Sequence, residues 1–188
     1  MSNFIPKDQR VITIEDSAEL SLIGVNNIVR LEMRQANLEG TGAITIRDLI
    51  HSSLRMRPDR LVIGEVRGAE ALDMIQAMNT GHDGCMSTGH GNSANDMLDR
   101  LATMSLTAMN IPLNAIKSQI ASAIDIIIHL GRVNKEGRKV LEISEISHFD
   151  GNNIVLNPLF TFKPNVGLAS TEYSHIHNDK LFQHNLSP

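Results

Sequence analysis

Residues 54–67 read Leu-Arg-Met-Arg-Pro-Asp-Arg-Leu-Val-Ile-Gly-Glu-Val-Arg, and this stretch decides the fold. Its apolar centre is a short run that ends at Gly64 and Glu65, which is typical of a buried strand followed by a turn. A helical pattern then covers 69–78 and closes at Gly81, a residue type that suits the end of a helix. The stretch therefore predicts a strand, a turn and a helix, which is the repeating unit of an α/β sheet.

The same alternation extends to both sides of this unit. Upstream, Thr45 and Asp48 have the spacing of a capping box, and the helix they begin should end before Pro58. The other expected elements of the α/β part are strands at 11–14, 27–34 and 84–88, and helices that begin at Ser93 and Pro112. Strand-like runs at 124–130, 140–146 and 154–156 come last, so a β-rich part should follow the α/β part.

The composition excludes several classes of protein. The chain has 188 residues, a formal net charge of -4 and one cysteine, Cys85. Interspersed charges leave no basic tract for nucleic acid, and a single cysteine allows no internal disulfide and no cysteine-based zinc site. The most apolar stretch, 124–130, is too short to cross a bilayer, and the first residues do not resemble a signal peptide. We expect a cytoplasmic protein without a metal cluster.

Polar side chains gather where three expected strands end. These clusters are Glu15-Asp16, residues 64–67 and residues 88–92. In open α/β sheets, ligands bind beyond the carboxyl ends of the strands. Carboxylates there could hold Mg²⁺ through water, and a histidine or arginine could contact a phosphate group. The alternative is structural: a carboxylate pair such as Glu15-Asp16 is often only a solvated strand end.

Two further features have competing interpretations. Four arginines, at positions 55, 57, 60 and 67, either recognise phosphate or form an exposed charged face that pairs with Asp59 and Glu70. His90 lies between two glycines, which would allow a ligand to approach its backbone closely. A metal-dependent hydrolase that uses His82, Asp83 and His90 is a weaker interpretation, because it rests on a dipeptide and one distant residue.

Taken together, these clusters resemble a known family. The runs 11–20, 54–67 and 77–84 are similar to those of the type II/IV secretion ATPase superfamily, and most similar to the ATPases that assemble Flp (tight-adherence) pili. The resemblance extends over about residues 10 to 162 in unbroken order. It implies a RecA-like α/β fold that binds ATP with Mg²⁺. It also implies a hexameric ring at the cytoplasmic face of the inner membrane, which works with the platform proteins of a pilus or secretion machine.

The resemblance also assigns roles to residues. It implies that Glu15 and Asp16 belong to an acidic "Asp box", that Glu65 closes an atypical Walker B strand as the catalytic glutamate, and that His90 belongs to a "His box". The implied catalytic residues are Glu65, Glu15 and His90; the implied phosphate-binding residues are Arg55, Arg57, Arg67, Thr88 and Asn92; Asp16 and Glu65 would hold Mg²⁺ through water. Gly89 and Gly91 depart from the usual His box, where the family has an aliphatic residue and an alanine.

A larger departure concerns the phosphate-binding loop. The family carries Gly-x-x-x-x-Gly-Lys-Ser/Thr upstream of the Asp box, and no lysine of this sequence lies in such a motif. That loop supplies the backbone amides, the lysine and the hydroxyl that hold the phosphates and Mg²⁺. We therefore expect that this chain alone neither binds ATP and Mg²⁺ productively nor hydrolyses ATP.

The expected organisation follows from these points. We predict a partial RecA-like core without its phosphate-loop strand at 1–130, a small β-rich appendage at 131–162 and a peripheral tail at 163–188. Missing strands leave open sheet edges, so a homodimer or a higher oligomer is expected. Two functional interpretations remain: the C-terminal part of a motor ATPase, or a short non-catalytic paralogue that joins or regulates an ATPase ring.

Overall fold

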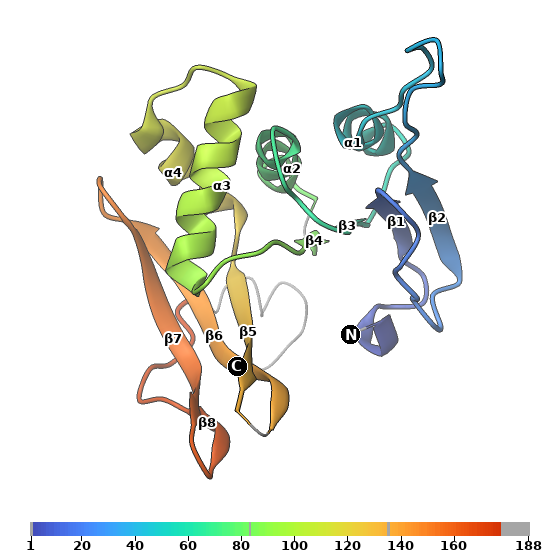
Figure 1. The fold of residues 1–188 in the computed structure, drawn as a ribbon. Coiled ribbons are helices and arrows are strands. Elements are labelled where there is room, and N and C mark those ends of the chain that lie inside the picture. Colours follow the sequence, from blue (N-terminus) through green and yellow to red (C-terminus); the bar gives the residue numbers. More distant parts are fainter. Residues whose placement is uncertain (1, 83, 135, 178–188) are drawn as a thin grey trace. The chain divides into compact units, whose positions relative to one another are not determined.

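The structure, a computed structural model, describes residues 2–82, 84–134 and 136–177. The chain forms two compact units (Figure 1). The first unit consists of Met1–His90 and Thr103–Ile111, and the second consists of Gly91–Ala102 and Pro112–Pro188. The helix α3 (Ala94–Ala108) contributes residues to both units.

A parallel sheet of four strands forms the centre of the first unit. The strands are β1 (Arg10–Glu15), β2 (Asn27–Glu32), β3 (Arg60–Ile63) and β4 (Met86–Ser87), in the spatial order β2-β1-β3-β4. β1 is buried from Val11 through Glu15, and β3 is buried from Leu61 onward. Strands buried on both faces of a parallel sheet have continuous apolar runs, which explains why the sequence showed these two most clearly.

Two helices connect the strands of this sheet. The helix α1 (Ile46–Leu54) follows β2, and its capping box is confirmed, because Thr45 and Asp48 exchange side-chain and backbone hydrogen bonds. The helix α2 (Glu70–Met78) follows β3. The buried carboxylate of Asp73 on α2 accepts from Arg47 Nε at 2.6 Å and lies 3.0 Å from His51 Nε2, so charged groups as well as apolar ones join the two helices.

The edges of the sheet differ from the expectation. β4 has only two residues, whereas the sequence predicted a strand over 84–88. It pairs with β3 through Val62↔Met86 and Ile63↔Ser87, and β3 is its single neighbour in the sheet order.

The second unit contains an antiparallel sheet. Its strands are β5 (Ile126–Val133), β6 (Gly137–Phe149), β7 (Ile154–Lys163) and β8 (Gly167–Ser170), and they pair in chain order. The helix α4 (Leu113–Ala123) packs against β6 and β7, with Ile116 and Ile120 fully buried. The expected α/β fold with a β-rich C-terminal part is confirmed.

The boundaries differ from those predicted. β5 spans residue 130, so the α/β part and the β-rich part do not separate there. Residues 167–170 form β8 and pair with β7, so the sheet extends beyond residue 162 into the segment expected to be a peripheral tail. Asn165 and Gly167 make the connecting turn possible, since both have positive φ angles, of 64° and 92°. The later part of that expected tail, 178–188, lies outside the described residues.

Residues 171–177, which we call the C-terminal strap, are fastened to the sheet through Glu145. This glutamate is fully buried, and its carboxylate accepts from the backbone amides of Ile176 and His177, each at 2.8 Å. His175 Nδ1 lies 2.5 Å from the same carboxylate. Asn157 adds a bond from its side-chain nitrogen to Ser174 O at 2.9 Å. The strap is therefore an ordered part of the second unit.

The ionisation of Glu145 reflects this arrangement. Burial by itself raises the pKa of a carboxyl group, but the amides of His177 and Ile176, the side chain of Asn157 and the charge of His175 outweigh burial and hold the pKa of Glu145 below its usual value. The group is thus a carboxylate at neutral pH, surrounded by donors.

Candidate functional site

The carboxyl ends of the parallel strands bring four predicted site residues together. Arg67 Nη2 donates to Glu65 Oε2 at 2.5 Å, and His90 Nε2 lies 3.1 Å from Glu65 Oε1. Arg67 Nη1 lies 3.6 Å from Asp16 Oδ2. These residues follow β1, β3 and β4, and parallel strands present their carboxyl ends at one edge of the sheet. The cluster is therefore a product of the topology.

The charges of this cluster stabilise one another. The hydrogen bond from Arg67, against the effect of burial, holds the pKa of Glu65 below its usual value, and His90 acts in the same direction. The same bond raises the pKa of Arg67. The side chain of Glu65 is 18% exposed, while that of His90 is 84% exposed. A mostly buried carboxylate thus lies beside two exposed cationic or ionisable groups.

Backbone bonds between the strand ends hold Glu65 in place. Gly64 N donates to Ile14 O, and Val66 N donates to Thr88 O. The hydroxyl of Thr88 donates to Gly64 O at 2.5 Å. Position 64 is tightly packed, because a Cβ atom there would lie 3.1 Å from the Cγ atom of Glu15. Thr88 therefore contributes to the site indirectly, because its hydrogen bonds hold the backbone of Gly64 and Val66 on either side of Glu65.

Glu15 does not reach this cluster with its carboxylate. It is buried, and its Oε1 atom accepts from the backbone amides of Glu19 and Leu20 at 2.9 and 2.8 Å. It therefore holds the turn after β1, which carries Asp16.

Sequence reasoning missed Glu19, whose negative charge acts on Arg67 and raises its pKa. The available signal was an acidic residue three positions after Asp16 in the same expected turn.

Two of the predicted residues lie elsewhere in the first unit, and a third belongs to the second unit. Arg55 follows α1 and Arg57 precedes Pro58, so both exposed side chains start from the amino end of β3, opposite the end that carries Glu65. Arg57 has a positive φ angle of 53°, which a non-glycine residue adopts rarely. Asn92 belongs to the second unit, where its backbone amide donates to Asp96 at the start of α3.

A groove of about 550 Å³ adjoins the cluster in the first unit. Asp16, Glu65 and Arg67 line one part of it, and Glu70 at the start of α2 lies beside them. The remaining lining comes from the segment between β2 and α1, namely Met33, Arg34, Gln35, Ala43, Ile44, Thr45, Ile46 and Arg47. The clustered charges are therefore accessible from an open groove with an apolar side.

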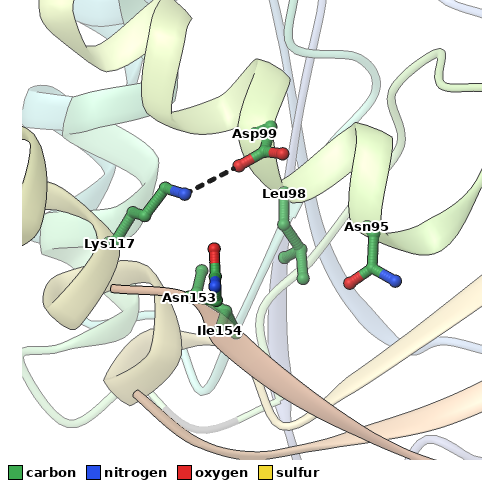
Figure 2. Close-up of a pocket in the computed structure, with 6 residues that line it drawn as sticks. All are labelled: Asn95, Leu98, Asp99, Lys117, Asn153 and Ile154. Carbon is green, nitrogen blue, oxygen red and sulfur yellow. Dashed lines mark ion pairs between the residues drawn. The ribbon is translucent and has the colours of Figure 1, made fainter. Parts of the chain in front are cut away.

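The second unit has a smaller pocket of about 260 Å³ (Figure 2). Lys117 on α4 points toward Asp99 on α3, and their charged atoms lie 3.0 Å apart. Asn95, Leu98, Asn153 and Ile154 complete the lining. None of the predicted site residues contributes to this pocket.

The described ranges contain neither a candidate membrane span nor a candidate metal site. No helix within 2–82, 84–134 and 136–177 has the length and hydrophobicity that a membrane span requires. The same ranges contain no group of three or more His, Cys, Asp or Glu side chains arranged to hold a metal ion. Of the residues of the metal-hydrolase interpretation, Asp83 lies outside the described residues.

Comparison with known proteins shows the family of this chain. Residues 1–164 match the family described as type II/IV secretion system protein. The chain is 37% identical over 151 residues to a provisionally named conjugal transfer protein of Mycobacterium tuberculosis, covering 80% of this chain and 42% of that protein. It is 36% identical over 148 residues to the type IV secretion system protein PtlH of Bordetella pertussis, covering 76% and 44%.

A solved structure agrees with the sequence relatives. The crystal structure of the VirB11 ATPase from the Brucella suis type IV secretion system, in complex with sulphate, superposes with a TM-score of 0.67 at 33% identity, covering 75% of this chain and 41% of that one. The chain spans about two fifths of the length of these relatives. The match over 1–164 and these identities establish that the chain belongs to the type II/IV secretion system protein family.

Proposed function

We propose that this chain is the C-terminal portion of a motor ATPase that couples ATP hydrolysis to the movement of pilin or another substrate in a secretion, pilus-assembly or conjugal transfer machine. The observation that carries the proposal is the contact of Glu65 with Arg67 and His90 at the carboxyl edge of the sheet. Family membership supplies the class of activity. The whole protein would act as a hexamer against platform proteins at the inner face of the membrane.

The clustered residues fit ATP and Mg²⁺. Asp16 and Glu65 are oxygen donors of the kind that Mg²⁺ binds through water, and Arg67 and His90 would contact phosphate oxygens. Glu65 Oε1 is buried and, among the described residues, has no well-aligned hydrogen bond, although His90 is 3.1 Å away. An ionised carboxylate with an unused lone pair is suited to orient an attacking water and accept its proton. Mg-ATP, when bound, would supply the transferable phosphoryl group and the divalent charge.

The 188-residue polypeptide by itself should not complete this site. Its sequence contains no Gly-x-x-x-x-Gly-Lys-Ser/Thr motif, which supplies the backbone amides and lysine that cradle the phosphates. Losing even one preorganised donor costs about 3 to 4 kcal/mol of transition-state stabilisation. We therefore propose that ATP turnover needs this chain together with a phosphate-binding loop.

Isothermal calorimetry with Mg-ATP tests this proposal. The two samples are this chain and the same chain extended upstream through a phosphate-binding loop. Heat of binding is expected only from the extended protein, and replacement of its loop lysine by alanine should remove that heat. Binding by this chain alone would show that Arg67 and His90 suffice as a phosphate site. Binding by neither protein would favour the alternative, a non-catalytic subunit of an ATPase ring.

Self-association is proposed from the sheet edges. β2 and β4 are the outer strands of the parallel sheet, and an uncovered edge presents unpaired amides and carbonyls to another chain. Multi-angle light scattering across micromolar concentrations should therefore find a mass at least twice that of one chain. A constant monomer mass over that range would count against this proposal, and a Ser87→Pro variant, which blocks pairing at β4, is the matched control.

A further inference from the structure

The turn between β3 and α2 carries two residues of the proposed site, and a third residue fixes its backbone. We infer that Glu70 is a positioning residue that holds the turn of Glu65 and Arg67 in its working conformation. The inference rests on the proposed function in so far as it assigns catalysis to Glu65. The sequence carries no signal for this role, since it indicates Glu70 only as a partner of exposed arginines.

The carboxylate of Glu70 accepts two consecutive backbone amides. Its Oε1 atom lies 2.6 Å from Arg67 N and 2.8 Å from Gly68 N. Gly68 fits closely against it, since a Cβ atom at position 68 would lie 3.3 Å from Glu70 Oε2. A carboxylate that receives two adjacent amides fixes the dihedral angles between them, because both donors must point at one oxygen.

In the described part of the chain, the N-cap residue of α2 provides no side-chain capping bond. That residue is Ala69. The first amides of a helix lack partners within it, and an N-cap side chain is the usual group that accepts from them. Glu70 instead turns back to the amides of Arg67 and Gly68, which belong to the turn that precedes the helix.

Positioning of the Arg67 backbone has a consequence for Glu65. The Arg67 side chain is 66% exposed, so little packing holds it, and its place between Glu65 and Asp16 depends on where its own backbone lies. Arg67 Nη2 donates to Glu65 Oε2 from that place. A turn released by loss of Glu70 should therefore free the Arg67 side chain and break its hydrogen bond to Glu65.

A purely structural role for Glu70 predicts something different. In that case Glu70 would act through its charge near the positive end of α2. Its loss would lower the free energy of unfolding without changing the hydrogen bond between Arg67 and Glu65. Glutamine separates the two roles, because its carbonyl oxygen still accepts both amides while the charge is gone. Alanine removes the acceptor and the charge together.

The first test uses NMR on the 188-residue chain, labelled with ¹⁵N. Glu70→Ala should weaken the hydrogen bond from Arg67 to Glu65, so the side-chain N–H groups of Arg67 should exchange with water faster than in the parent chain. It should also speed hydrogen exchange of the Arg67 and Gly68 amides by about fivefold or more. Glu70→Gln should keep both properties near those of the parent chain. The control is Glu39→Ala, which removes an exposed carboxylate from the segment between β2 and α1.

A second variant protects the test against a folding defect. Gly68→Ala leaves Glu70 in the sequence but crowds its carboxylate, so it should shift the same two properties in the same direction and by less. The inference is overturned if Glu70→Ala lowers the unfolding temperature while the exchange of the Arg67 side-chain N–H groups and of both amides stays as it was. It is also overturned if glutamine and alanine have equal effects on that exchange.

The complete motor supplies an independent readout. Glu70→Ala should lower kcat by about 10- to 100-fold, the scale expected for a displaced catalytic group, with little change of KM for ATP. Glu70→Gln should restore most of kcat. If the complete protein does not hydrolyse ATP, the proposed function fails, whereas the NMR result on Glu70 still decides whether Glu70 positions this turn.

Discussion

Replacing Glu145 by alanine should destabilise the second unit by about 3 kcal/mol. The variant leaves the amides of Ile176 and His177 without their acceptor and removes the ion-pair partner of His175. Urea unfolding should show the loss directly. Tyr173 lies in the strap and is the single tyrosine of a chain without tryptophan, so its fluorescence reports release of the strap.

The matched control is Glu172→Ala, because Glu172 is an exposed carboxylate within the strap itself. Its stability should stay within about 0.5 kcal/mol of the parent chain. A Glu145→Ala variant as stable as Glu172→Ala would show that the strap contributes nothing to the fold.

The contribution of Glu145 should also depend on pH in a defined direction. Its pKa is lower in the folded chain than in the unfolded chain, so the folded state favours the carboxylate. The stability it supplies is therefore complete above the ordinary glutamate pKa of about 4.3 and is lost as the pH falls through the lower folded value. The difference in unfolding free energy between the parent chain and Glu145→Gln should be constant from neutral pH to about pH 5 and shrink below about pH 4.

Glu65→Gln should cause the largest loss of activity in the complete motor. Because glutamine cannot accept the proton of the attacking water, kcat for ATP hydrolysis should fall by about 10²- to 10⁴-fold, the usual contribution of a general base. Mg-ATP affinity should change little, since Arg67 and His90 remain. Steady-state ATPase rates and calorimetry on the same preparation separate the two quantities.

The control for this change is Glu39→Gln, which removes a carboxylate from an exposed loop. It should leave both turnover and affinity unchanged. Turnover of Glu65→Gln at the parent rate would remove Glu65 from the chemistry and would leave Asp16 or Glu19 as the remaining carboxylates near Arg67.

The parallel sheet could be predicted from the sequence because its strands are buried on both faces. The apolar runs of β1 and β3 end abruptly at Glu15 and Gly64, and topology alone then collects the residues that follow. Glu65, Arg67 and His90 could be placed together for that reason. The Thr45 capping box was equally predictable, since its spacing is set by one helical turn.

The hydrogen bonds from backbone amides to carboxylates, which hold the turns and the strap, could not be predicted from the sequence in the same way. Glu15, Glu70 and Glu145 each bind two consecutive backbone amides, at positions 19 and 20, 67 and 68, and 176 and 177. A backbone amide carries no sequence signal, so a carboxylate that binds one resembles any other acidic residue. The strap and β8 were missed for this reason, and also because a four-residue strand of Gly, Leu, Ala and Ser has almost no pattern.

The way the strap is fastened bears on which of its positions can vary. Every amino acid except proline provides a backbone amide, so residues 176 and 177 should accept most substitutions and reject proline. The acceptor has no such freedom, because aspartate is shorter and glutamine carries hydrogen atoms of its own toward the donors. A saturation scan would therefore find that many substitutions are tolerated in the strap and few at Glu145, which is distant in the sequence. An alignment of the strap alone would then show little similarity, although the segment is folded.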